Sequence, residues 1–206
     1  LDLVHLASLI RCWACLDAVD RAPAGAFRES LTRFRTADGG YHRVPGQRAA
    51  TVYDAFLACG AWEDLGAAPG EPDRLVEAVA ACRAADGGVA NAPNQPAGAT
   101  APTAAAMCLL GAAGRSVDAS LPRWLVGMCA EEGGFRAHPL APTPDLLSTA
   151  VALFAMRRAG VEPAPDVRNR CRSFVLRASG DDGSFRAGPG DARGDCEYTF
   201  YGLLAL

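Results

Sequence analysis

The sequence predicts an all-α fold made of stacked helical hairpins, and two repeated phrases carry that prediction. The first phrase is an acidic residue, then Gly, then Gly or Ser, then an aromatic or branched apolar residue. It occurs four times, starting at Asp38, Asp86, Glu132 and Asp182, at intervals of 48, 46 and 50 residues. A period near fifty residues is typical of a chain that stacks one supersecondary unit several times.

The second phrase is a threonine that opens an apolar run, at Thr51, Thr103, Thr149 and Thr199. The acidic residue precedes this threonine by 17 residues in the last three repeats and by 13 in the first. We interpret the four threonines as counterparts of one another, with a first repeat that is four residues shorter. The matched spacing in three units indicates a true repeat.

Each repeat opens with an amphipathic stretch. In the fourth, the apolar residues Val167, Cys171, Phe174 and Val175 lie at i, i+4, i+7 and i+8, which is one face of a helix. We expect Asp166 to cap the N-terminus of this helix. The second and third repeats carry a similar stripe, and residues 3–19 predict an additional leading helix.

The Gly pair ends these helices, because glycine tolerates the positive φ of a tight turn and allows close backbone approach. We expect the acidic residue of the turn to accept hydrogen bonds from nearby backbone N–H groups, which is a structural role for Asp38, Asp86, Glu132 and Asp182. A loop rich in Pro and Gly follows each turn. Long loops without secondary structure of their own are often functional.

The segments that the threonines open are apolar nearly all round, as at 103–110 and 149–154, and such helices are buried. Each repeat therefore pairs an outer amphipathic helix with an inner buried one, and no convincing strand appears. The repeats span roughly 27–66, 72–114, 120–160 and 166–206. Hairpins of this kind can curl into an α/α toroid whose inner helices line a cavity. We predict such a toroid, a partial or small barrel of about four to four and a half repeats, with residues 1–206 as a single domain.

Composition narrows the function. The formal net charge of −3 argues against nucleic-acid binding, which usually needs a basic surface. No apolar run approaches the roughly 18 residues of a membrane-spanning helix. The first residues lack the basic leader of a signal peptide, and the eight cysteines read mostly as small core residues. We therefore expect a cytoplasmic, reducing environment.

The two phrases together resemble the repeat of the protein prenyltransferase β-subunit and terpene cyclase superfamily, over roughly residues 27–206. That family repeats an acid-Gly-Gly-aromatic turn followed, after a loop, by an inner helix. One departure is that the family's usual Gln, three residues before the acid, is replaced by Arg35, Arg83, Cys129 and Ser179.

Within this resemblance the last repeat is the most informative, because residues 195–201 (DCEYTFY) are similar to the prenyltransferase zinc segment Asp-Gly-Cys-Tyr-Ser-Phe-Trp. The resemblance implies a zinc ligand at Asp195. It implies a diphosphate contact at Tyr198, which is our candidate catalytic residue, and a wall of the isoprenoid cavity at Tyr201. The family's second zinc ligand, a Cys, falls on Glu197.

That last departure changes the expected metal. Two carboxylates suit Mg²⁺ or Mn²⁺ better than zinc, so Asp195 and Glu197 predict either zinc by resemblance or Mg²⁺ by donor chemistry. The alternative is that Asp195 only caps the inner helix. Asp145 supports the alternative, because it occupies the same place before Thr149 without a plausible second ligand.

Diphosphate binding needs Arg or Lys side chains at the mouth of the cavity. Arg136 and Arg186 directly follow the turn aromatic in repeats three and four, and Arg193 lies two residues before the segment's Asp. We predict all three as substrate-binding residues. The family's own basic residues fall on Ala192 and Pro189 and are not matched.

Two functions follow from these observations. The first is a prenyltransferase β-subunit-like protein that binds an isoprenoid diphosphate or another lipid-like ligand and, if it is an enzyme, transfers the prenyl group. The second is a non-catalytic scaffold or binding module of the same fold that acts with a helical partner chain or with a second copy. The terpene cyclase branch uses an Asp-x-Asp-Asp acid that is absent here, since Asp181 and Asp182 belong to the turn.

Overall fold

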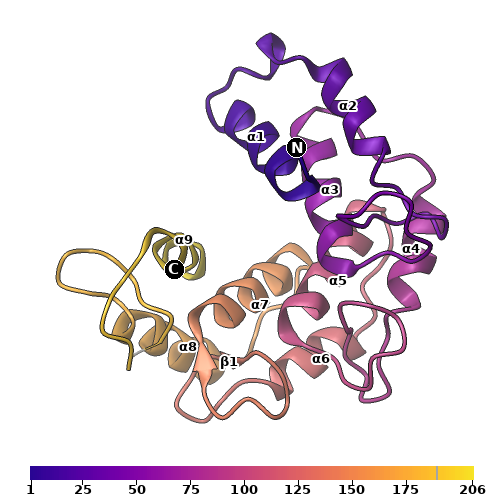
Figure 1. The fold of residues 1–206 in the computed structure, drawn as a ribbon. Helices are drawn as coiled ribbons and strands as arrows, with labels where there is room; N and C mark the ends of the chain where they lie inside the picture. The colour runs from indigo at the N-terminus through magenta and orange to yellow at the C-terminus, as the bar shows by residue number, and fades with distance from the viewer. Residues whose placement is uncertain (189) are drawn as a thin grey trace. The chain divides into compact units, whose positions relative to one another are not determined.

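The computed structural model describes residues 1–188 and 190–206, and nine α-helices lie in this part of the chain (Figure 1). Pro189 lies outside the described residues. The outer and leading helices are α1 (Leu3–Cys15), α2 (Ala24–Thr32), α4 (Pro72–Ala80), α6 (Ser120–Gly127) and α8 (Pro165–Arg177). The inner helices are α3 (Val52–Asp64), α5 (Thr100–Ala112), α7 (Leu146–Arg158) and α9 (Cys196–Ala205). The all-α prediction is confirmed, and each predicted repeat contains one outer and one inner helix.

The chain divides into two compact units. Unit 1 comprises Leu1–Arg83 and Asn91–Gln95, and unit 2 comprises Ala84–Ala90 and Pro96–Leu206. In unit 1, α1 packs against α3. In unit 2, α7 packs against both α5 and α9, so the inner helices of this unit follow one another side by side in chain order. The assignment of residues 1–206 to one domain stays a prediction.

Three local expectations were wrong. The leading helix ends at Cys15 rather than residue 19, since Asp17 adopts a positive φ of 50°, and a short 3₁₀ turn, η1 (Val19–Arg21), follows. Asp166 does not cap α8, because Pro165 occupies the first helical position, where its missing N–H costs nothing. Two short strands also form, β1 (Phe135–Arg136) and β2 (Pro144–Asp145), which pair antiparallel and close the loop of repeat three.

Three of the four turn acids accept hydrogen bonds from backbone N–H groups, as predicted. Asp38 accepts from Gly40 N at 3.2 Å and from Ala50 N at 2.9 Å, which lies on the far side of the loop. Asp86 likewise accepts from the N–H groups of Gly88 and Gly98. Asp182 accepts from the backbone N–H and the hydroxyl of Ser184. Glu132 instead offers its backbone carbonyl to the guanidinium of Arg177.

The interpretation of Thr51 as the counterpart of Thr103 was wrong. Thr51 N donates to Tyr41 O, just as Ala99 N donates to Val89 O and Asp195 N donates to Phe185 O. Thr51 is therefore the N-cap of its inner helix, in the place that Ala99, Asp145 and Asp195 occupy in the others. The first repeat is not shorter; it lacks the threonine one turn further on, where it has Ala55.

The other three threonines tie each loop to its inner helix. Thr149 accepts a hydrogen bond from Phe135 N at 2.9 Å and donates to Asp145 O at 2.7 Å. Thr103 and Thr199 make the same pair of bonds in their own repeats. This shared geometry is the physical reason for the constant spacing of 17 residues between acid and threonine.

A further set of backbone bonds joins successive repeats. The first residues of α3, α5 and α7 donate their N–H groups to the loop of the next repeat: Val52 to Asn91 O in unit 1, and Thr100 to Ala137 O and Leu146 to Ala187 O in unit 2. Because these donors have no partner within their own helix, the bonds satisfy groups that every helix start leaves open.

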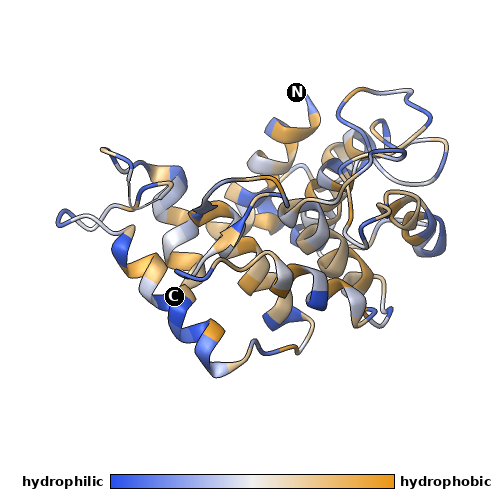
Figure 2. Cartoon of the chain, turned by 90° about the horizontal axis from the view of Figure 1, so that it is seen from below, coloured by the Kyte–Doolittle hydropathy of each residue, from blue (hydrophilic) through white to orange (hydrophobic). Residues whose placement is uncertain are grey.

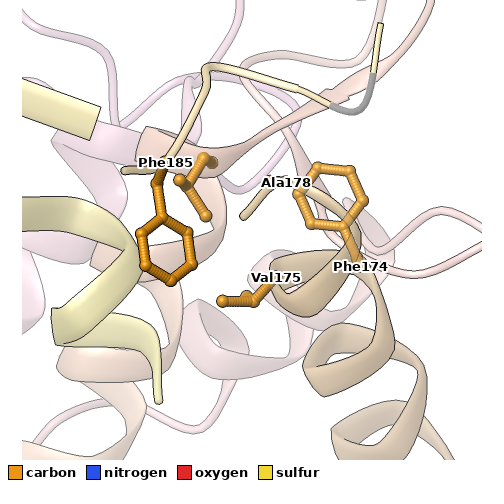
Figure 3. Packing of buried hydrophobic residues seen from close by; sticks show 5 residues of the cluster. Phe174, Val175, Ala178 and Phe185 are labelled. Atoms are coloured by element: carbon orange, nitrogen blue, oxygen red, sulfur yellow. The ribbon is translucent and has the colours of Figure 1, made fainter. Parts of the chain in front are cut away.

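Side chains between the layers form the core. Leu146, Phe174, Val175, Ala178 and Phe185 gather in one cluster of unit 2, where residues of α8 meet the turn aromatic of repeat four (Figure 3). In Figure 2 much of the helical ribbon is coloured as hydrophobic, and long stretches of the loops are hydrophilic. Among the described residues, no helix combines the length and the apolar character that crossing a membrane would require.

Candidate functional site

Asp195 is the N-cap of α9. Its Oδ1 atom accepts a hydrogen bond from Tyr198 N at 2.8 Å, and the side chain is otherwise exposed. Asp145 caps α7 in the same way, with Oδ1 2.7 Å from Ser148 N. The two caps are equivalent, so the capping role that the sequence offered as an alternative for Asp195 is present in the structure.

Asp195 and Glu197 by themselves do not make a closed metal site. Both lie at the exposed N-terminal turn of α9. Nowhere in residues 1–188 and 190–206 do three or more His, Cys, Asp or Glu side chains gather as a metal would require. Structural zinc is held by four protein ligands and catalytic zinc by three, whereas Asp195 and Glu197 supply only two carboxylates.

Tyr198 and Tyr201 lie on the inward side of α9. Their ring centroids are 6.5 Å apart, and both residues pack against the core cluster of unit 2. Burial raises the pKa of the Tyr198 phenol, and the negative charge of Asp145 and Glu197 raises it further. The Tyr198 hydroxyl is therefore neutral at physiological pH and lies in a negative environment, which suits a cation better than a diphosphate.

The three predicted arginines lie in different settings. Arg136 N donates to Met128 O and Arg186 N donates to Ala178 O, so these two occupy matching places in repeats three and four. Arg136 is half-buried, and its Nε atom is buried with no hydrogen-bond partner. Arg193 is exposed in the last loop. Of the three, Arg136 is the best candidate for binding an anion, because a buried donor without a hydrogen-bond partner costs free energy that a bound anion would recover.

The inner helices of unit 2 expose an apolar stripe that we did not predict. On α7 the stripe is Leu147, Val151 and Phe154, all partly exposed, at i, i+4 and i+7. The same helix positions on α9 are Glu197, Tyr201 and Leu204. The signal in the sequence is weak, because these helices are apolar on every face and periodicity cannot single out one stripe.

A second apolar face of α9 is more exposed. Phe200 and Leu203 are 61% and 64% exposed, whereas Ala150, the counterpart of Phe200 on α7, is fully buried. Phe200 makes an edge-on contact with Tyr201, with ring centroids 5.4 Å apart. We call Cys196, Phe200, Leu203 and Leu206 the outer face of α9.

A pocket of about 340 Å³ lies among the loops of repeats three and four and α8. None of the substrate-binding, catalytic or metal-ligating residues predicted from the sequence lines it. Carboxylates of Glu132, Asp145 and Asp191 line it together with one cation, Arg177. This excess of negative charge disfavours a diphosphate. The pocket could not be predicted from the sequence, because its lining residues come from four separate segments.

Comparison with known proteins assigns this helical architecture to a family. The sequence model of the prenyltransferase alpha-alpha toroid domain matches residues 2–139 and 123–206, which together span nearly the whole chain. No curated protein matches the chain.

Several solved structures share the fold. The chain is similar to Candida albicans protein geranylgeranyltransferase-I complexed with GGPP, with a TM-score of 0.78 and 12% identity, over 99% of this chain and 65% of that one. It is also similar to a type II terpene cyclase from Scytonema in complex with geranylgeranyl dihydroxybenzoate, with a TM-score of 0.70 and 15% identity, over 97% and 61%. For ent-copalyl diphosphate synthase from Streptomyces platensis the TM-score is 0.62 and the identity 19%, over 88% and 34%. The chain thus spans about two thirds or less of the length of these proteins.

Proposed function

This chain belongs to the prenyltransferase alpha-alpha toroid family, and from that premise we propose that it is a prenyltransferase β-subunit-like protein that binds an isoprenoid diphosphate. The observation that carries the proposal is the apolar stripe on α7, continued by Tyr201 and Leu204 on α9. An isoprenoid chain is a long, flexible hydrocarbon. Binding it would remove from water an apolar surface that the inner helices otherwise leave exposed.

Arg136 is the residue we propose for the diphosphate. Its buried, unpartnered Nε supplies a donor, and a guanidinium pairs with phosphate oxygens in a fork. Arg186 and Arg193 are proposed as weaker contributors, since Arg193 is exposed. Tyr198 lies among carboxylates, so its proposed catalytic role is to donate a hydrogen bond from its neutral hydroxyl rather than to attract the diphosphate by charge.

Calorimetric titration tests this proposal. We expect geranylgeranyl diphosphate to bind, and the uncharged geranylgeraniol to bind more weakly. Val151→Asp should abolish binding of both ligands. Arg136→Gln should weaken the diphosphate roughly tenfold or more, because hydrogen bonds to charged groups contribute about 1.5–3 kcal/mol, and should leave geranylgeraniol unchanged.

Arg172→Gln is the matched control, because Arg172 is exposed on the outer helix α8 and should affect neither ligand. Circular dichroism confirms that each variant is folded. A folded wild-type protein that gives no heat with either ligand would overturn the proposal.

A divalent cation at Asp195 and Glu197 is a separate proposal. We expect Asp195→Asn to lose zinc or magnesium detected by mass spectrometry in the purified protein, while the neutral amide still caps α9. Asp145→Asn is the control, since Asp145 caps α7 in the same way. Equal metal content in the wild type and in Asp195→Asn would leave Asp195 as a helix cap alone.

The second candidate function is a non-catalytic binding module, and the outer face of α9 favours it. Phe200 and Leu203 are exposed, whereas Ala150, the counterpart of Phe200 on α7, is buried. We propose that a helical hairpin of a second copy of this chain covers this face, with a different helical partner as the alternative. A cytoplasmic location is also proposed, because no disulfide joins the cysteines that the structure describes.

A further inference from the structure

Two cysteines of different repeats meet in unit 2. Cys129 lies just after α6, in the turn of repeat three, and Cys171 lies on α8 of repeat four. Their sulfur atoms are 3.9 Å apart. Cys171 is fully buried, whereas Cys129 is partly exposed, so a solvent-borne reagent reaches Cys129 first.

The residue three positions before the turn acid, which is Cys129 in repeat three, also contacts the next repeat elsewhere in the chain. Arg35 is the counterpart of Cys129 in repeat one, three residues before the turn acid. Its guanidinium donates to Gly70 O at 2.7 Å and pairs with Glu71 at 2.9 Å, just before α4. Cys129 makes the corresponding contact with the next outer helix through a thiol. The family's usual Gln at this place could not form a covalent bond there.

The surroundings of Cys129 stabilise a thiolate. Arg170 lies on α8 beside Cys171; its Nη1 pairs with Asp166 at 3.0 Å, but its buried Nε has no hydrogen-bond partner. The hydrogen bond from Cys171 lowers the pKa of Cys129 to about 7; burial opposes this shift, and the hydrogen bond and positive charge of Arg170 add to it. The hydrogen bond to Cys129, and then burial, raise the pKa of Cys171. Cys129 is the nucleophile of the pair and Cys171 the resolving thiol.

We propose that Cys129 and Cys171 are a reversible thiol–disulfide site, oxidised by hydroperoxides, that covalently joins repeats three and four. The Cys129 thiolate attacks one peroxide oxygen, the O–O bond breaks, and the other oxygen leaves with a proton as water or an alcohol. Cys129 is then a sulfenic acid. Cys171 attacks its sulfur, the S–S bond forms, and the hydroxyl group leaves with the Cys171 proton as water. Two electrons pass from the two thiols to the peroxide, and a dithiol reductant reverses the reaction.

The bond would change the neighbouring pocket. Glu132 lies three residues after Cys129, and Phe174 and Arg177 lie three and six residues after Cys171; all three line the pocket. A disulfide would fix the turn of repeat three to α8 and so fix two walls of the pocket relative to each other.

The test uses the full chain with the three exposed cysteines, Cys12, Cys15 and Cys196, replaced by Ser to suppress links between molecules. Hydrogen peroxide is added at pH 7.5, and peptide mapping by mass spectrometry locates the oxidised residues. We expect one intramolecular link, between Cys129 and Cys171. Closing a loop of this size should raise the unfolding midpoint by about 5 °C or more, and dithiothreitol should reverse the rise.

Two further measurements keep the proposal falsifiable. In a Cys171→Ser variant, whose hydroxyl keeps a hydrogen-bond donor beside Cys129, dimedone should label Cys129, because the sulfenic acid has no resolving thiol. The buried Cys108 should stay unlabelled in the same sample and serves as the internal control. If the variant is unstable, peptide maps of the oxidised parent protein test the proposal on their own. Oxidation of Cys129 to sulfinic acid with Cys171 still reduced, or no oxidation of Cys129 above Cys108, would overturn the proposal.

Discussion

At the scale of single residues, a few polar side chains decide how each loop is held. Asp38 and Asp86 accept hydrogen bonds from backbone N–H groups across the loop. Thr103, Thr149 and Thr199 do the same in their repeats. Asp54 plays a similar part in repeat one. It is fully buried, accepts from Arg43 N at 2.9 Å and pairs with the Arg43 guanidinium at 3.0 Å. Repeat one therefore replaces the threonine bond by an ion pair.

Thr149 provides the sharpest residue-scale prediction. Thr149→Val removes a buried hydroxyl and leaves Phe135 N without its acceptor. The free energy of unfolding should fall by about 1–3 kcal/mol, the cost of an unsatisfied buried donor. Thr149→Ser keeps the hydroxyl and should lose less. Thr143→Val, in an exposed loop position, should be neutral. Urea unfolding followed by circular dichroism measures all three, and equal effects at Thr143 and Thr149 would contradict the assigned bond.

At the scale of elements, the Gly turn sets how closely an outer helix approaches the preceding repeat. Gly134 has a φ of 82°, and a Cβ there would lie 2.8 Å from the ring of Phe174 on α8. The neighbouring Gly133 has a φ of 92° and faces the Arg170 carbonyl. These contacts explain why both turn positions are glycine, because a side chain at either one would clash with α8.

A pair of glycine substitutions tests this element. Gly134→Ala should destabilise the protein by about 2–4 kcal/mol, through the left-handed backbone and the clash with Phe174. Gly111→Ala, near the end of α5 with no atom in reach, should stabilise it by about 0.5 kcal/mol. Thermal unfolding measures both. The idea fails if Gly134→Ala has an unfolding midpoint equal to that of the wild type.

At the scale of the whole molecule, the outer face of α9 is the surface that we propose another helical hairpin covers. Contiguous exposed apolar residues usually mark an interaction surface. We expect sedimentation velocity to show association of the purified chain that rises with concentration. Phe200→Ser should shift the distribution toward monomer. Leu140→Ser is the control, since Leu140 is an isolated loop residue that is 89% exposed. A monomer at every concentration would exclude a second copy as the occupant and leave a different helical chain.

Local patterns predicted most of the elements. The period near fifty residues, the Gly turns and the amphipathic stripes located the outer and inner helix of every repeat, because these signals depend on neighbours along the chain. The role of Asp38 as a loop-holding acceptor also followed from its place before glycine. A predicted helix end was wrong where a single backbone angle sets it. The positive φ of Asp17 follows a helix that ends at Cys15, whereas we predicted residue 19.

What only the tertiary structure decided concerns residues that are distant in sequence. The place of Thr51 in its repeat is set by the hydrogen bond from its backbone N–H to Tyr41 O. Sequence spacing alone suggested that Thr51 corresponds to Thr103, which is wrong. The exposed stripe on α7 could not be separated from its buried faces, because all of them are apolar. Cys129 and Cys171 are 42 residues apart and read as core cysteines. Packing of one repeat on the next brings their sulfur atoms together, and side-chain contacts between repeats leave no periodic trace in the sequence.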